Sequence, residues 1–326
     1  MANLETKYLG LTLKNPLIVA SSGLTKTPQK IEDCEKAGAG AVVIKSIFEE
    51  VLTQDASKIE QSIEAHPEAY DYLLSELELQ YGFDEYVDLI KAAKDKVSIP
   101  VIASINCTSE HYWPEFAAKI EEAGADALEL NVFSVIASRR KDSAEVENMY
   151  YNIIKKVKAH TKLPVAMKIG SNFTSLPNLV YNLENRGLDG LVLFNRFTEP
   201  DIDINNLDLK TTFTFSRKTD YHQILRWAAI LFGETKIDLS TTTGIHTWES
   251  AVKLLLAGAT TVQLASVLYE KGVEEIHSFN ERIEKWMEQH KLNSIEEFRG
   301  RLSFKKSHSP QTYLRSQFLD KLRNIE

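Results

Sequence analysis

The fold is decided by the stretch "WPEFAAKIEEAGADALELNV", which runs from Trp113 to Val132. Its first part has the apolar spacing of an amphipathic helix, and Gly124 in the triplet "AGA" ends that helix. The second part, from Ala127, is a short apolar run typical of a buried strand. The stretch therefore predicts a helix followed by a buried strand, the unit from which parallel sheets with helical crossovers are built.

Similar short runs recur along the chain, and most are followed by a helical segment such as "TWESAVKLLLAG". They begin at Leu17, Ala41, Val101, Ala127, Val165, Leu191, Ile237 and Thr261. Eight such units predict a single (β/α)8 TIM barrel rather than an open sheet. We expect the barrel to span residues 1–304 and residues 305–326 to form a helical extension, packed on the barrel or at a subunit interface.

Two connections are too long for plain barrel loops. One joins Ser46 to Val101, and the other covers residues 196–223. Both leave the carboxyl ends of strands, where barrel enzymes keep their chemistry, so we interpret them as inserts that cover an active site.

The composition narrows the range of partners. A net charge of -8 disfavours nucleic acid and anionic membranes, which need a clustered basic face. Cys34 and Cys107 lie far apart, so neither a disulfide framework nor a cysteine-based zinc site is indicated and no metal is expected. The chain has no signal-peptide core and no apolar run long enough for a membrane helix. We expect a cytoplasmic protein with a small-molecule substrate.

Polar side chains stand at the predicted carboxyl ends of the strands, where burial is costly unless each finds a partner. One such residue is more often structural, but a set that converges on one face predicts a site. Two of them, Lys45 and Lys168, suit an anionic or electron-rich ligand, although each could instead pair with a loop carboxylate. The set comprises Ser21, Ser22, Lys45, Asn106, Asn131, Lys168, Asn195, residues 241–244, Ala265 and Ser266.

The last two predicted strands end in "STTTGIHT" and "VQLAS", the positions where barrels commonly bind phosphate through loop amides. Gly244 would let the backbone approach a phosphate, but it would also suit an ordinary tight turn. The chain has no Walker loop and no Rossmann glycine fingerprint, which disfavours a nucleoside triphosphate or NAD bound by this chain alone.

Several motifs, in matching order and spacing, resemble the FMN-dependent dihydroorotate dehydrogenase family over residues 5–303. They are "LKNPLIVASSG", "VVIKS", "ALELNV", "PVAMK", "LVLFNRF", "TTTGIHTWESAVKLLLAGATTVQLAS" and "NSIEEFRGRLS". Residues 102–131 also resemble the FMN domain of dihydropyrimidine dehydrogenase. The resemblance implies an FMN flavoprotein oxidoreductase that acts on the CH–CH bond of a dihydropyrimidine, by default dihydroorotate in pyrimidine biosynthesis. It also implies a homodimer and leaves open an electron-transfer partner subunit.

The family's functional residues can be carried over one by one. Its base falls on Ser134, although this serine could also be a loop hydroxyl that caps local backbone. Lys45 is expected beside the flavin and substrate, and Lys168 beside the flavin, where a cation stabilises the reduced form. The expected substrate contacts are Gln80, Asn131 and Asn195. The expected FMN contacts are Ser21, Ser22, Lys45, Asn106, Asn131, Lys168, Thr243, Gly244, Ala265 and Ser266.

The sequence departs from the family where the substrate is recognised. Val135 and Ile136 replace a Pro-Asn pair, and Gln80 replaces an asparagine. Two alternatives therefore stand beside the family default: a flavin oxidoreductase that acts on another substrate, and a non-catalytic FMN-binding subunit. Arg139 and Arg140 could close over a carboxylate or simply be exposed, and His246 is expected near the phosphate rather than in catalysis.

Overall fold

A closed parallel barrel forms the centre of the protein, as seen in a computed structural model that describes residues 2–48, 82–106, 113–133, 135–196, 200–211 and 215–314. Every predicted strand is present, and pairing between β4 and β6 and between β13 and β3 closes the ring. The prediction of a single (β/α)8 barrel is confirmed. The barrel strands are β3 (Leu17–Val19), β4 (Ala41–Val43), β6 (Val101–Asn106), β7 (Ala127–Asn131), β8 (Val165–Ile169), β9 (Gly190–Leu193), β12 (Asp238–Thr242) and β13 (Thr261–Leu264). A short strand, β5 (Ile47–Phe48), adds a further pairing to β6.

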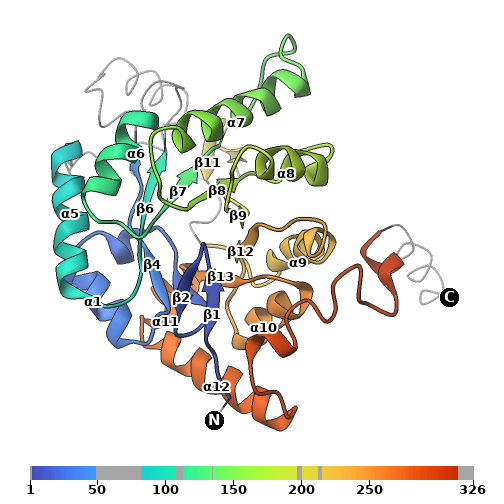
Figure 1. Cartoon of the computed structure of the whole chain (residues 1–326). Helices are drawn as coiled ribbons and strands as arrows, with labels where there is room; N and C mark the ends of the chain where they lie inside the picture. The colour runs from blue at the N-terminus through green and yellow to red at the C-terminus, as the bar shows by residue number, and fades with distance from the viewer. Residues whose placement is uncertain are drawn as a thin grey trace.

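Helices surround the barrel, as Figure 1 shows. Their ends carry the signals expected from sequence: Asp142 caps α7 by accepting a hydrogen bond from the Glu145 amide at 2.8 Å, and Gly258 ends α10 with a φ of 128°. The α-helices are α1 (Pro28–Lys36), α5 (Phe83–Lys96), α6 (Trp113–Glu122), α7 (Ser143–Lys158), α8 (Leu176–Glu184), α9 (Tyr221–Leu231), α10 (Trp248–Ala257), α11 (Ser266–Lys271) and α12 (Glu275–Gln289). Short 3-10 helices are η1 (Gly23–Thr25), η2 (Ile295–Glu297) and η3 (Pro310–Tyr313).

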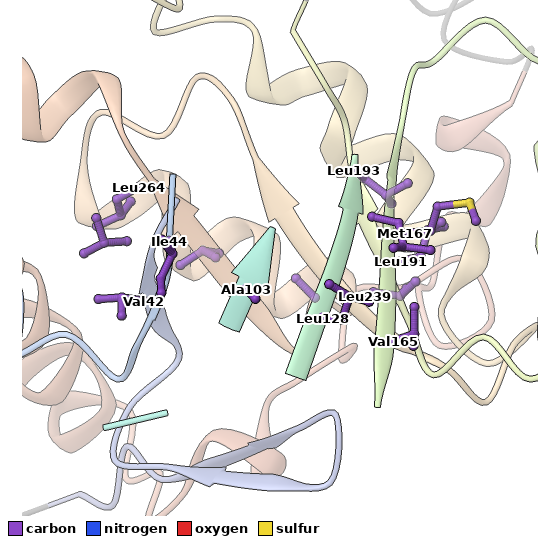
Figure 2. Packing of buried hydrophobic residues seen from close by; sticks show 14 of the residues in the cluster. Val42, Ile44, Ala103, Leu128, Val165, Met167, Leu191, Leu193, Leu239 and Leu264 are labelled. Carbon is purple, nitrogen blue, oxygen red and sulfur yellow. The ribbon is translucent and has the colours of Figure 1, made fainter. Parts of the chain in front are cut away.

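Alternate residues of each strand point to two separate apolar clusters. Outward side chains such as Leu128, Val165 and Leu191 belong to the large core shared with the helices, and Figure 2 shows several of them along neighbouring strands. Inward side chains such as Ala127 and Ala166 belong to a smaller cluster inside the barrel. The same alternation carries Glu129 and Asn131 of β7, and Lys168 of β8, to the inside of the barrel.

An amino-terminal hairpin closes one end of the barrel. Its strands are β1 (Thr6–Tyr8) and β2 (Leu11–Leu13), and Leu9 at the turn packs inside the barrel with Ala166. Gly190 makes room for it, because a Cβ added there would lie 2.6 Å from Leu9 Cδ2. Since apolar side chains fill this end, a ligand site is confined to the opposite, carboxyl end of the strands.

The two long connections differ in what they contain. The first includes α5, an ordinary barrel helix, and its residues 49–81 lie outside the described part of the chain. The second contains an unpredicted antiparallel hairpin of β10 (Pro200–Asp203) and β11 (Asp208–Thr211). Leu207 at its turn is 86% exposed, so this hairpin stands out from the core. Whether either connection covers a site stays a prediction.

The carboxyl-terminal segment reaches η3, where Tyr313 donates a hydrogen bond to the Leu302 carbonyl and packs near α9. Residues 315–326 lie outside the described part, so the predicted terminal helix stays a prediction. None of the described helices combines the length and apolar character needed to cross a membrane.

Candidate active site

Three predicted site residues come together where β7, β8 and β9 end. Asn131 lies beside Lys168 in the β7–β8 register, and Asn195 follows β9 directly. The Asn195 amide donates a hydrogen bond from Nδ2 to Asn131 Oδ1 at 2.8 Å. The two asparagines therefore hold each other in place next to a half-buried lysine.

A chain of hydroxyl groups organises the opposite side of the barrel mouth. Ser21 accepts a hydrogen bond from the Ser46 amide at 2.8 Å, and the Ser46 and Ser104 hydroxyls are 2.6 Å apart. Tyr86 from α5 donates to the Ser104 carbonyl and accepts from the Ser104 amide, both at 2.8 Å. This chain fixes the strand ends around Lys45, which directly precedes Ser46.

Two other predicted cofactor contacts lie near this hydroxyl chain. Ser22 uses its side chain to cap η1, accepting a hydrogen bond from the Leu24 amide at 3.3 Å. Asn106 is the last residue of β6 and is half-buried beside Phe48 of β5. Neither position shows by itself whether Ser22 or Asn106 contacts a cofactor.

The turn after β12 is sharp. Thr243 and Gly244 have φ values of 79° and 77°, and the Thr243 hydroxyl donates to the Phe194 carbonyl at 3.3 Å. A Cβ at Gly244 would collide with the backbone of Asp220 and Tyr221 at the start of α9. Glycine is therefore required here by contact with the chain itself, whatever the turn also binds.

A buried polar network that the sequence analysis missed lies beside this turn. The Ser216 hydroxyl is 3.0 Å from His246 Nε2 and donates to Ser266 Oγ at 3.0 Å, while His246 Nδ1 is 3.3 Å from a Glu270 oxygen. His246 is only 3% exposed. The predicted phosphate-side residue Ser266 is thus joined to the second long connection through Ser216, whose type and position gave no signal in the sequence.

A second missed feature is an acid inside the barrel. Glu129 is 1% exposed and accepts a hydrogen bond from Gln263 Nε2 at 2.8 Å. Burial raises the pKa of its carboxyl group, whereas the Lys168 cation and the Gln263 hydrogen bond act in the opposite direction. The only sequence signal was a charged residue in the middle of an apolar strand.

The loop after β7 borders a cavity of about 330 Å³ that lies between the start of α7 and the loop after β8. Val135 and Ile136, which replace the family's Pro-Asn pair, both line it. Arg139 and Arg140 are exposed. Ser134, Gln80 and Cys107 lie outside the described residues, so their predicted roles are not tested.

A closed parallel barrel with an apolar plug at one end and lysine and asparagine side chains at the other defines a (β/α)8-barrel protein with an enzyme-type site. A family model described as "Dihydroorotate dehydrogenase" matches residues 3–287. The chain belongs to the dihydroorotate dehydrogenase family, whose members are flavin-dependent oxidoreductases that act on CH–CH donors.

Similar curated proteins cover almost the whole chain. "Dihydroorotate dehydrogenase B (NAD(+)), catalytic subunit" of Pyrococcus furiosus is 30% identical over 305 residues, 91% of this chain and 98% of the relative. The protein of the same name from Thermoplasma acidophilum is 28% identical over 312 residues, 92% and 99% of the two chains. A "Putative dihydroorotate dehydrogenase A (fumarate)" of Aeropyrum pernix is 26% identical over 301 residues, 91% and 96%. The names of these relatives thus differ in the electron acceptor.

Proposed function

We propose that this protein is an FMN-dependent dehydrogenase that oxidises the CH–CH bond of a dihydropyrimidine ring, with dihydroorotate as the default substrate. The observation that carries the proposal is the cluster of Asn131, Lys168 and Asn195 at adjoining strand ends, in which Asn195 donates a direct hydrogen bond to Asn131. Family membership and relatives named for dihydroorotate support it.

The amide and ammonium groups at the carboxyl ends of the strands are suitable for binding a flavin. A flavin ring presents several carbonyl and nitrogen atoms, and amide and ammonium groups are suitable partners for them. Lys45, Asn106, Asn131 and Lys168 would hold the ring, and groups after β12 and β13 would hold the phosphate. The hydroxyl of Ser266 is partly buried there and already organised by Ser216. When bound, FMN would supply a hydride acceptor at N5.

The chain's own residues would bind and orient the substrate and move one proton. Asn131 and Asn195 would grip the ring through amide hydrogen bonds, with Gln80 as a further contact. Lys168 would provide positive charge beside the cofactor, and Lys45 would lie beside both ligands. Ser134 would take the proton from the substrate carbon, through a water or a neighbouring group because a serine hydroxyl is a weak base.

The alternatives concern the substrate and the acceptor. Because Val135 and Ile136 line a cavity where the family has Pro-Asn, another heterocyclic or enoate-like substrate is the second candidate. For the acceptor, we propose a separate electron-transfer subunit, since the chain lacks a dinucleotide fingerprint and several relatives are named as catalytic subunits of an NAD(+)-linked enzyme. A homodimer remains part of the proposal.

The test begins with the cofactor. Purified protein is denatured and the released chromophore identified; FMN is expected, and a protein that neither contains nor takes up FMN would refute the proposal. Dihydroorotate and dihydrouracil are then added anaerobically while flavin absorbance is followed. Bleaching by dihydroorotate supports the default substrate, whereas bleaching by dihydrouracil alone favours the alternative. No bleaching by either, despite bound FMN, argues for a non-catalytic subunit.

A further inference from the structure

A polar pair crosses the middle of the barrel, one layer below the candidate site. Glu129 comes from β7 and Gln263 from β13, strands that lie on opposite sides of the ring. Both residues are 1% exposed, and the Gln263 amide donates from Nε2 to Glu129 Oε2 at 2.8 Å. The next inward residue of β7 is Asn131, which belongs to the site.

Two oxygen atoms of this pair lack partners. Glu129 Oε1 and Gln263 Oε1 are both buried and have no hydrogen bond within the described residues. Two buried acceptors without a donor are costly, because burial removes them from bulk water and no described group replaces that hydrogen bond. A proton on Glu129 Oε1 would remove this cost, since the acid becomes a donor and the amide carbonyl is a suitable acceptor.

The surroundings of Glu129 have opposite effects on the pKa of its carboxyl group. Lys168 on β8 favours the ionised carboxylate, while burial favours the neutral acid and raises the pKa of Glu129. Tyr8 from the plugging hairpin and Tyr86 from α5 also interact with Glu129, and burial raises the pKa of both phenols, so neither adds charge near neutrality. Asp238 acts on Tyr8 as well.

We propose that Glu129 is a neutral carboxylic acid, paired reciprocally with Gln263, and that it acts as a positioning residue that leaves the charge of Lys168 uncompensated beneath the cofactor. No hydrogen bond or ion pair holds the Lys168 ammonium group among the described residues. A carboxylate one layer below would offset that cation, whereas a neutral acid does not. This inference rests on the proposed function for the role of Lys168, but the protonation state of Glu129 is independent of it.

The Tyr8 hydroxyl is the competing donor, because it is buried and interacts with Glu129, with the Ser240 hydroxyl as its other polar neighbour. If the phenol donated to Glu129 Oε1, the carboxyl could stay ionised with both oxygens satisfied. The two arrangements differ in where a proton resides, and infrared spectroscopy detects the carbonyl stretch of a protonated carboxyl group directly.

The experiment records infrared spectra in D2O of the full chain, with cofactor removed and with FMN bound. Wild type is expected to show the protonated carboxyl band near neutral pH, and Glu129→Gln to lack it. Gln263→Met should keep the band but shift it, and Tyr8→Phe should leave it in place. Glu121→Gln is the matched control, because hydrogen bonds from Thr161 and Lys162 hold the pKa of half-buried Glu121 below its usual value. Absence of the band from wild type would overturn the proposal, even if Glu129→Gln failed to fold.

The second readout is the ratio of reduced to oxidised FMN at a fixed potential. Glu129→Gln replaces a neutral acid by a neutral amide, so this ratio should stay within about twofold of wild type. Removal of an ionised carboxylate would instead raise the ratio by about tenfold or more, equivalent to one pKa unit of interaction, and would refute the proposal. If the protein binds no FMN, the proposed function fails while the infrared result still decides the state of Glu129.

Discussion

Replacing Lys168 by methionine should lower the reduction potential of the bound flavin without unfolding the protein. The lysine is half-buried at the end of β8, and its ammonium group makes no ion pair within the described residues. Methionine retains a long apolar stem and removes only the charge. Negative charge gained by the cofactor on reduction would therefore lose a stabilising cation.

The size of the shift follows from Coulomb's law. Two unit charges about 4 Å apart interact by about 4 kcal/mol at an effective dielectric constant of about 20. Because Lys168 is partly exposed, solvent screening reduces this, and we expect about 1 to 2 kcal/mol to be lost. For a two-electron couple, about 1.4 kcal/mol corresponds to about 30 mV, so the potential should fall by about 20 to 40 mV.

The assay is an anaerobic titration of the bound flavin against reference dyes. Lys168→Arg keeps the positive charge and should stay close to wild type, and Lys91→Met removes an exposed lysine of α5 as a control for general charge effects. Circular dichroism confirms that each variant is folded. An unchanged potential in Lys168→Met with FMN fully bound would show that this lysine does not lie beside the flavin.

Four further outcomes are expected. Ser134→Ala should bind FMN and accept electrons from dithionite, but its reduction by substrate should be slower by about 10²-fold; equal anaerobic bleaching rates would make the serine a loop residue. Ile136→Asn should strengthen dihydroorotate binding by about 1 to 3 kcal/mol, the worth of one restored buried hydrogen bond, and titration with unchanged affinity would remove Ile136 from the substrate site. Gly190→Ala should destabilise the protein by about 1 to 3 kcal/mol in urea unfolding, yet cost much less in a Leu9→Ala background; equal costs in both backgrounds would contradict the steric argument. The pKa of Glu129 is raised on folding, so its contribution to stability is present below the unfolded-state pKa and is lost as pH rises through the folded-state pKa. Wild type should therefore lose stability relative to Glu129→Gln as pH rises. A difference in urea midpoints that does not change with pH would refute this.

The barrel could be predicted because its signals are local and repeated. Each buried strand is an apolar run of a few residues, and Gly258 and its counterparts end helices in the same triplet. Parallel strands place their carboxyl ends on one face, so the meeting of Asn131, Lys168 and Asn195 followed from strand direction alone. Their hydrogen bond did not, since it depends on side-chain rotamers.

Features that depend on contacts between distant segments were not predictable. The β10–β11 hairpin is not such a feature. Its sequence "DIDINNLDLK" alternates polar and apolar residues on both sides of an Asn-Asn pair, so this pattern could have predicted both strands. Gly190 looks like any strand glycine until Leu9, far away in sequence, is found against it. Ser216 acquires its role only because His246 and Ser266 surround it.

The barrel interior changes from apolar to polar along its axis. The presence of a buried polar pair in the middle layer is not explained by stability alone. Leu9 and Ala127 belong to the apolar cluster that fills the closed end, and Asn131 and Lys168 occupy the open end. Between them, leucine and methionine in place of Glu129 and Gln263 together would bury apolar surface without leaving polar groups unpaired, and apolar replacements of a whole buried polar pair are often neutral or stabilising. On our proposal the acid is retained because it is neutral yet polar. The neutral acid donates a hydrogen bond to the Gln263 amide across the barrel, which fixes β7 directly below Asn131. Because it carries no negative charge, it does not offset the positive charge of Lys168.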